Sequence, residues 1–226
     1  IALLNVTTGP GGINALNGIY GAYTDSIGMI VVSGQVKRET YLRSYSLPIR
    51  QLGDQEVDIV SMVKPIVKYA KTIMNPDDIG IVMDKVLFLL TSGKPGPVWI
   101  DVPIDVQAAI INTTKLKRFN GNISSLICDN AISENTEYDL KIKRTSLTKT
   151  LFNQILNLLK NSKRPVLFTG SGVRISGAHD DFMKLVRKLK IPVVTGWNAH
   201  DAIANDNPYY CGRPGTVGDR PGNFTV

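Results

Sequence analysis

The stretch IALLNVTTGPGGINALNGIYGAY, residues 1–23, decides the fold of this chain. Ile1–Val6 is a short apolar run that ends at a glycine-rich loop, which is typical of a buried strand. Ile13–Tyr23 then carries apolar residues at positions 13, 15, 16, 19, 20 and 23, the spacing of an amphipathic helix. The stretch therefore predicts a strand, a glycine loop and a helix in succession.

The same alternation continues along the chain. Further strands are expected at Met29–Ser33, Ile66–Ile73 and Pro97–Val102. Asn75-Pro76-Asp77-Asp78 has the proline and acidic residues of a first helical turn, and Ile79–Leu90 has helical periodicity. Strands that alternate with helices predict an α/β fold with a doubly wound parallel sheet.

The composition and the periodicity of the sequence change after Gln107. Residues 110–146 are rich in Asn, Ser, Thr and Lys and have weak periodicity, as in a surface linker. A second α/β unit is expected beyond them, with elements at Leu147–Leu159, Pro165–Thr169, Asp180–Leu189 and Ile191–Thr195. The sequence thus predicts two doubly wound, parallel-sheet domains at 1–108 and 147–226, joined by a linker at 109–146.

Composition excludes several classes of protein. The 226 residues are 43% hydrophobic and 20% charged, with a mean hydropathy near zero, which excludes collagen, coiled coil and a disordered chain. No apolar run approaches the ~18 residues of a membrane-spanning helix and no leader opens the chain, so we expect a cytoplasmic protein without a membrane partner. The chain opens inside an apolar run at Ile1, so we expect an interior piece of a longer protein with both domains incomplete.

Charge and cysteines suggest neither nucleic acid nor metal. The net charge is +7, but the basic residues are dispersed, and no aromatic residues interleave with the densest group as single-strand binding requires. We therefore expect no nucleic-acid partner. Cys128 and Cys211 form no CxxC pair, so we expect neither a disulfide framework nor a metal site from them.

Three segments stand where parallel sheets bind ligands, at the carboxyl ends of predicted strands. They are Thr7–Asn14, Ser33-Gly34-Gln35 and Gly170–Arg174. A glycine loop before a helix is more often an ordinary turn than a ligand site, and none of the three segments has the full dinucleotide-binding fingerprint. These residues by themselves indicate an α/β protein with a candidate nucleotide site.

The residue identities in seven blocks of the sequence are more specific than its periodicity. The blocks concerned are Thr7–Leu16, Ala22–Ser26, Val31–Val36, Asp54–Val60, Lys64–Lys68, Ser92–Pro103 and Asp105–Gln107. In this order and spacing they closely resemble the pyrimidine-binding domain of thiamine diphosphate-dependent enzymes of the acetolactate synthase type, over residues 1 to about 108. The second half is similar to the central domain of the same enzymes, from Arg164 through Gly170-Ser171-Gly172 to Gly212–Thr216.

This resemblance implies a carbon–carbon lyase or transferase acting on a 2-ketoacid, with thiamine diphosphate and Mg²⁺ as cofactors of the full-length protein. It implies cofactor contacts from Pro10, Gly11, Asn14 and Gln35, with Gln35 also catalytic at the reacting centre. It implies an active site between subunits, hence a homodimer or tetramer. The family's activating glutamate and Mg²⁺-binding Gly-Asp-Gly segment have no counterpart here, so we expect no metal ligand and no activity from these residues alone.

Other positions bear on the substrate. Asp54 and Gln55 match the vicinity of the family's second-substrate pocket, where Asp54 replaces an aromatic residue. An acid there should disfavour an anionic acceptor. Lys68 matches a family lysine near the substrate entrance, and a solvated charge at a strand end explains it equally well.

A flavin or nucleotide site is the remaining candidate, in the second half. It would comprise Gly170, Gly172, Arg174 and Gly215. The segment Gly212-Arg213-Pro214-Gly215-Thr216 departs from the Gly-Met-His-Gly-Thr of flavin-binding members, which leaves FAD binding open. His179 and His200 are expected in surface or capping roles.

The alternative to an enzyme is a non-catalytic or differently specific cofactor-binding paralogue of the same fold. Thr169–Ser176 is also similar to the glycine turn of sirtuin-like deacylases. Those enzymes carry four zinc-binding cysteines, which a chain with two cysteines cannot supply.

Overall fold

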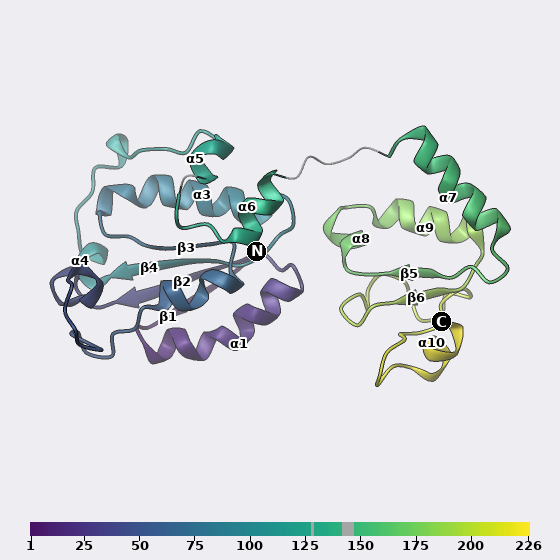
Figure 1. Ribbon diagram of the computed structural model, residues 1–226, viewed down its shortest axis with the longest axis horizontal. Coiled ribbons are helices and arrows are strands. Elements are labelled where there is room, and N and C mark those ends of the chain that lie inside the picture. The colour runs from purple at the N-terminus through teal and green to yellow at the C-terminus, as the bar shows by residue number, and fades with distance from the viewer. Residues whose placement is uncertain (128, 142–146) are drawn as a thin grey trace. The chain divides into compact units, whose positions relative to one another are not determined.

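The computed structural model describes residues 1–127, 129–141 and 147–226. The chain divides into two compact units, Ile1–Lys143 and Arg144–Val226 (Figure 1). Each unit is built on parallel strands, as the alternation of strands and helices predicts. Within the described ranges, no helix combines the length and apolar character needed to cross a bilayer.

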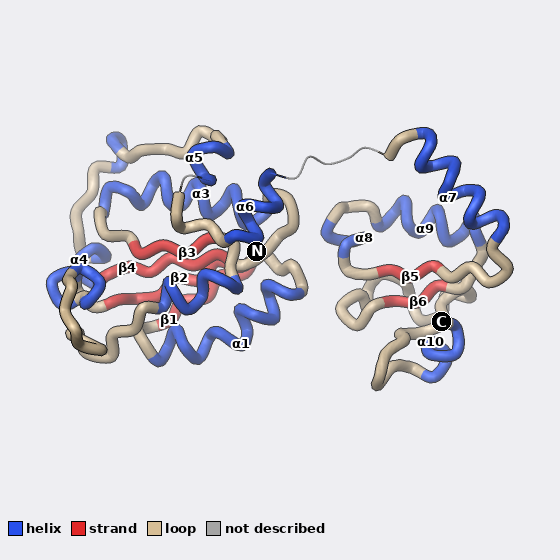
Figure 2. The backbone as a smooth tube through the Cα atoms, in the orientation of Figure 1, coloured by secondary structure: helices blue, strands red, loops and turns tan. Residues whose placement is uncertain are grey.

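A four-stranded parallel sheet forms the centre of the first unit, in the order β1-β2-β4-β3 (Figure 2). The strands are β1 (Ala2–Val6), β2 (Met29–Gln35), β3 (Tyr69–Thr72) and β4 (Val98–Pro103). The predicted strands are confirmed, with β3 shorter than expected. Because all four strands run the same way, their carboxyl ends meet at one edge of the sheet.

Helices cover both faces of this sheet (Figure 1). They include α1 (Pro10–Thr24), α2 (Ile59–Val63), α3 (Ile79–Thr91) and the single turn α4 (Ile104–Gln107). α1 and α2 pack with Val31 and Trp99 on one face, and α3 packs with Ile30 and Val98 on the other. Successive strand residues point to opposite faces, so each strand contributes to both cores.

Helix α1 begins where the sequence predicts, directly after the glycine loop. Pro10 is its first residue, a position where the absent N–H has no helical partner to lose. Gly9 precedes it with a φ of 55°, and a Cβ there would lie 1.9 Å from the carbonyl oxygen of Gln55. Only glycine allows this close approach between two loops.

Residues 109–146 differ from the linker expected there, because most of the segment belongs to the first unit. It contains α5 (Ile123–Ile127) and α6 (Glu134–Lys141). Leu126 and Ile132 are buried in the same core as α3. A few apolar anchors hold a segment whose average composition is polar, so composition did not reveal the packing. The expected linker residues 142–146 lie outside the described residues.

The second unit is built on two parallel strands, β5 (Leu167–Thr169) and β6 (Val193–Thr195). Its helices are α7 (Lys149–Asn161), α8 (Gly172–Ile175), α9 (His179–Leu189) and α10 (Arg220–Thr225). Phe182 and Val186 of α9 pack on Val193. The helices and strands predicted here are confirmed, and the turn Gly170-Ser171-Gly172 follows the carboxyl end of β5.

Candidate functional site

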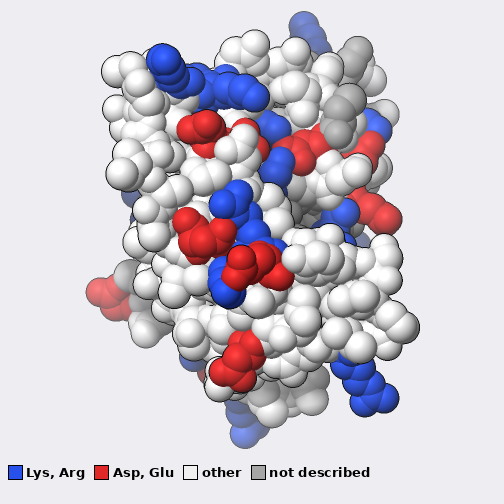
Figure 3. All heavy atoms as spheres, turned by 90° about the vertical axis from the view of Figure 1, so that its left-hand side faces the viewer, with Lys and Arg blue, Asp and Glu red and all other residues white. Residues whose placement is uncertain are grey.

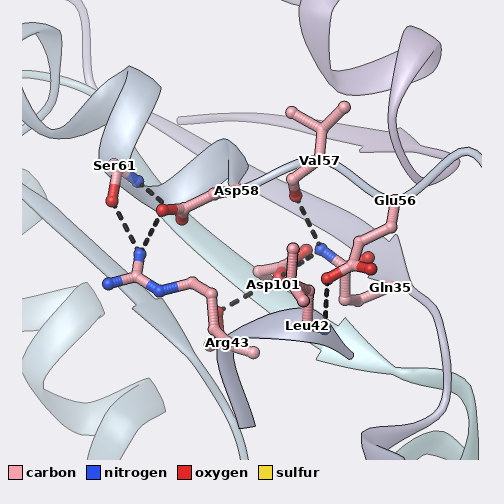
Figure 4. Close-up of polar contacts among 9 residues, drawn as sticks. Gln35, Leu42, Arg43, Glu56, Val57, Asp58, Ser61 and Asp101 are labelled. Carbon is pink, nitrogen blue, oxygen red and sulfur yellow. Dashed lines mark hydrogen bonds and ion pairs between the residues drawn. The ribbon is translucent and has the colours of Figure 1, made fainter. Parts of the chain in front are cut away.

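Gln35 ends β2 at the carboxyl edge of the first sheet and is only 4% exposed. Its Nε2 donates to the Val57 carbonyl at 3.0 Å and to Asp101 Oδ2 at 3.1 Å (Figure 4). Its Oε1 accepts from Thr8 Oγ1 at 2.9 Å and from the Val36 N–H at 3.0 Å. All four hydrogen-bonding positions of the amide are used. Gln35 therefore joins the glycine loop, the loop before α2 and strand β4.

Asp101 is a candidate residue that the sequence analysis did not single out. It is completely buried in β4 and accepts from Ser33 Oγ at 2.5 Å and Thr72 Oγ1 at 3.1 Å, as well as from Gln35. Burial raises the pKa of Asp101 to about 6, although its hydrogen-bond donors act in the opposite direction. An acidic residue inside an apolar strand was the signal that could have identified it.

Two carboxylates hold the loop between β2 and α2. Glu56 accepts from the backbone N–H of Leu42 at 2.5 Å and of Gly53 at 3.0 Å. Asp58 caps the start of α2 and pairs with Arg43 (Figure 4). Burial opposes the ionisation of Asp58, but hydrogen bonds from Arg43 and from the first turn of α2 lower its pKa overall. The loop is therefore tied down beside Gln35 by charge-assisted hydrogen bonds.

Asp54 and Gln55 lie in this loop and are exposed. Gln55 has a φ of 56°, and its carbonyl stands against Gly9. The structure thus brings Gln55 to the start of α1, where Pro10 is exposed and Gly11 is half-buried. Asn14 lies one turn further along α1 and is also exposed.

A cavity of about 810 Å³ opens at the carboxyl ends of β1, β2 and β4. Thr7, Thr8 and Gln35 line it, together with the apolar side chains of Val102 and Ile104. Of the residues expected to contact a cofactor, this cavity includes Gln35. The others, at the start of α1, lie outside its lining: Pro10, Gly11 and Asn14.

Lys68 is not brought to this edge. It precedes β3, at the amino end of the strands, and is 5% exposed. Its Nζ donates to the carbonyls of Leu89 at 2.5 Å, Ser92 at 2.6 Å and Lys94 at 2.9 Å, around the end of α3. Burial lowers the pKa of Lys68 to about 8. The geometry is that of a cation capping a helix C-terminus.

In the second unit, the candidate nucleotide residues adjoin the carboxyl end of β5. A Cβ added to Gly170 or Gly172 would meet no atom within 4 Å. The Arg174 guanidinium donates to the Asp201 carbonyl at 2.5 Å and pairs with its carboxylate at 2.9 Å. Among the described residues, the buried Thr169 hydroxyl has no hydrogen-bond partner. At this edge, therefore, the backbone of Gly170 and Gly172 is accessible, and one buried hydroxyl lacks a hydrogen bond.

Gly215, the fourth candidate residue here, has a φ of 155°, and an added Cβ would lie 2.9 Å from Trp197 Nε1. Arg213, two residues earlier, lies over the Trp197 ring, 5.5 Å from its centroid. His200 Nδ1 lies 2.5 Å from an Arg213 nitrogen, and His179 Nε2 lies 3.0 Å from the Ala202 carbonyl. Both histidines thus contact loops of this unit.

Charges of both signs are interspersed on the face drawn in Figure 3. Ion pairs in the first unit include Arg38 with Asp105 at 2.6 Å and Arg118 with Asp84 at 2.8 Å. In the parts of the chain that the structure describes, no three His, Cys, Asp or Glu residues gather as metal ligands would.

Comparison with known proteins identifies both units. Residues 1–62 match the family model for the N-terminal TPP binding domain of thiamine pyrophosphate enzymes, and residues 152–226 match the model for their central domain. The chain is 31% identical over 224 residues to a probable acetolactate synthase large subunit of Methanocaldococcus jannaschii, covering 97% of this chain and 34% of that protein.

Two further relatives have similar names. The chain is 31% identical over 226 residues to the acetolactate synthase isozyme 3 large subunit of Escherichia coli, covering 100% of this chain and 35% of that protein. It is 32% identical over 220 residues to the acetolactate synthase large subunit of Cyanidium caldarium, covering 97% and 34%. The chain thus spans about a third of the length of the curated relatives it matches.

The two family matches contain part of the sites described above. The glycine loop, Gln35 and Asp58 fall within the first match, and Gly170–Arg174 falls within the second. Together the matches cover more than half of the chain, and relatives with acetolactate synthase names align with almost all of it. The chain belongs to the thiamine pyrophosphate enzyme family.

Proposed function

We propose that this chain forms part of a thiamine diphosphate-dependent enzyme that acts on a 2-ketoacid, as an acetolactate synthase-like transferase or a decarboxylase. One observation carries the proposal. The loop at Thr7–Gly12 is tied to Gln35 at the carboxyl edge of a parallel sheet, inside the segment that matches the thiamine-binding family model. The names of the relatives support the same activity.

The start of α1 suits one end of the cofactor. Pro10 and Gly11 offer an accessible backbone surface against which an aromatic ring can lie, and Asn14 adds an exposed amide one turn later. When bound, thiamine diphosphate would supply the thiazolium ring that makes carbanion chemistry at the ketoacid possible, while these residues would bind and orient its aromatic end. We assign Mg²⁺ and the diphosphate to residues outside these 226.

Gln35 is the proposed catalytic residue of this chain. All of its hydrogen-bonding positions are filled, so a contact with a reacting group would replace one of the present bonds. The bond from the Thr8 hydroxyl is the one most readily exchanged, because a hydroxyl can turn its proton elsewhere. The Gln35 oxygen would then be free to accept a hydrogen bond from a hydroxyl or N–H group at the reacting centre, while its Nε2 stays on Asp101 and Val57.

Asp54 bears on the second substrate. Its carboxylate is exposed in the loop that reaches the start of α1. A negative charge there opposes the approach of a second ketoacid anion. The proposal therefore favours an uncharged acceptor, or release of the aldehyde after decarboxylation. Gln55 would lie in the substrate vicinity, whereas the helix-capping position of Lys68 gives it a supporting role.

A second ligand is proposed for the second unit. The unpartnered Thr169 hydroxyl and the open space over Gly170 and Gly172 favour a nucleotide group lying across the carboxyl end of β5. Arg174 lies in α8, directly after this turn, and Gly215 stands against Trp197, two residues beyond β6. We leave open whether such a nucleotide carries a flavin, as FAD does.

The remaining proposals concern the setting of the enzyme. We propose a homodimer or tetramer, as the family resemblance implies, and a cytoplasmic location, as expected from the hydropathy of the sequence. We also propose that the chain has no nucleic-acid partner, and on the face drawn in Figure 3 charges of both signs are mixed.

The test must detect weak binding, because we expect the chain alone to bind thiamine diphosphate with a dissociation constant no lower than about 1 mM. ¹⁵N-labelled chain would be titrated with millimolar thiamine diphosphate and Mg²⁺ while backbone amide signals are followed. We expect shifts at residues 8–14 and at Gln35, and none around Lys68 and Ser92 at the opposite edge. Inorganic diphosphate is the control ligand and should leave residues 8–14 unmoved.

Two results would contradict the proposal. The first is that the amide signals of residues 8–14 do not shift even at the highest soluble concentration of the cofactor. The second is an identical pattern with inorganic diphosphate, which would mean that only the charged tail is bound. Micromolar, Mg²⁺-dependent binding would show instead that the assignment of Mg²⁺ to other residues is wrong.

A further inference from the structure

Asp101 occupies a position where a carboxylate has to be compensated. It lies in β4, between two other strands of the sheet, and has no exposed surface. A buried charge is costly unless several donors satisfy it. The proposed function gives Asp101 no contact with cofactor or substrate, so its presence needs another explanation.

The strand register supplies the donors. Ser33 on β2 and Thr72 on β3 are the residues paired with Asp101 on either side. The Ser33 hydroxyl accepts from Trp99 Nε1 at 2.8 Å, so its own proton is free to donate to Asp101 at 2.5 Å. Thr72 donates from the other side at 3.1 Å. Gln35 lies two residues beyond Ser33, on the same face of the sheet, and completes the set.

This arrangement leaves the Gln35 amide with one favourable orientation. In that orientation its NH₂ faces two pure acceptors, the Asp101 carboxylate and the Val57 carbonyl (Figure 4). Its oxygen faces two donors, the Thr8 hydroxyl and the Val36 N–H. A flipped amide would set oxygen against the carboxylate and NH₂ against the Val36 N–H.

We propose that Asp101 is a positioning residue whose carboxylate fixes the orientation of the Gln35 amide and, through it, the Val57 loop and the Thr8 loop, the second of which lines the 810 Å³ cavity. Any effect of this positioning on catalysis rests on the proposed function. The coupling of Asp101 to Gln35 is a property of the first unit and can be tested without cofactor.

The electrostatic surroundings make the coupling sensitive to pH. Burial raises the pKa of Asp101 to about 6. The other titratable groups that act on it are Asp58, at the start of α2, and the buried Tyr41. Asp58 is itself paired with Arg43 and has a lowered pKa, so it stays ionised in this range. Protonation of Asp101 removes the negative charge that strengthens its three accepted hydrogen bonds, so the bond from Gln35 Nε2 weakens.

The experiment follows the side-chain NH₂ signals of Gln35 in ¹⁵N-labelled chain between pH 4.5 and 7.5. The signals would be assigned by their loss in Gln35→Glu. We expect them to titrate with a midpoint near 6 in the wild-type chain, and this titration to vanish in Asp101→Asn. Asp84→Asn is the matched control: this partly buried acid on α3 pairs with Arg118, and its loss should leave the Gln35 titration unchanged.

Two outcomes would overturn the proposal: Gln35 signals that stay constant across the range in wild type, or a titration that survives in Asp101→Asn. Should Asp101→Asn fail to fold, Thr72→Val removes one donor to the carboxylate and should shift the midpoint upward, and an unmoved midpoint would contradict the network. Failure of thiamine diphosphate to shift residues 8–14 would reject the proposed function while leaving this coupling intact, so the two results are separable.

Discussion

At the scale of single residues, the buried carboxylate of Asp101 should make stability depend on pH. Its folded-state pKa of about 6 lies above its ordinary value of 3.8, so the folded protein binds more protons between these limits. The stabilising contribution is therefore full below about pH 4 and is lost as the pH rises through 6, a change of about 3 kcal/mol.

The measurement is urea unfolding of wild type and Asp101→Asn at pH 4 to 7. Fluorescence of the fully buried Trp99 would report on the first unit, in a Trp197→Phe background that removes the exposed tryptophan of the second. Wild type should gain stability relative to the variant as the pH falls from 6 to 4. A difference that is constant with pH would mean that Asp101 titrates at its ordinary value.

Lys68 makes a second residue-scale prediction. Its ammonium satisfies three carbonyls around the C-terminus of α3 and is almost fully buried. Lys68→Met keeps much of the aliphatic volume but leaves those acceptors without their donor, so we expect a loss of about 2 to 3 kcal/mol in the free energy of unfolding. Lys94→Met, at an exposed side chain nearby, should change it by less than about 0.5 kcal/mol. Equal effects of the two variants would exclude the capping role.

At the scale of elements, two glycines of the loop and helix at the start of the chain should respond in opposite directions. Gly9 has a positive φ and stands against the Gln55 carbonyl, so Gly9→Ala should cost more than about 2 kcal/mol and separate the two loops. Gly18 lies in the middle of α1 with open space around it, and Gly18→Ala should stabilise by up to about 1 kcal/mol. Unfolding followed by Trp99 fluorescence distinguishes these outcomes, and destabilisation by Gly18→Ala would indicate that this helix face is covered.

At the scale of the whole molecule, the boundary between the units can be tested by truncation. A chain ending at Lys141 keeps α5 and α6, whereas one ending at Ala108 loses the buried Leu126 and Ile132. Each such side chain contributes about 1.5 to 3 kcal/mol, so the shorter chain should lose about 3 to 6 kcal/mol, comparable to the full stability of a small domain. If residues 1–108 melt cooperatively at the same temperature as residues 1–141, then residues 109–141 do not stabilise the first unit. That result would agree with the linker expected from composition.

The sequence by itself determined the alternation of the main strands and helices, the parallel sheets and the membership of the family. These features depend on local chemistry. Apolar periodicity marks Ile79–Leu90 as a helix, and the glycine loop at Thr7–Gly12 is needed because Gly9 must adopt a positive φ. Such signals are contained in a few consecutive residues, so they can be recognised before the chain is folded.

Only the tertiary structure decided how distant residues meet. Strand register set Ser33 and Thr72 beside Asp101, and the crossing of loops brought Val57 and Thr8 to Gln35. The same was true of Lys68 at the end of α3 and of the packing of α5 and α6. These contacts join segments separated by tens of residues, and their energies come from burial and from satisfying buried polar groups, which exist only once the sheet has formed.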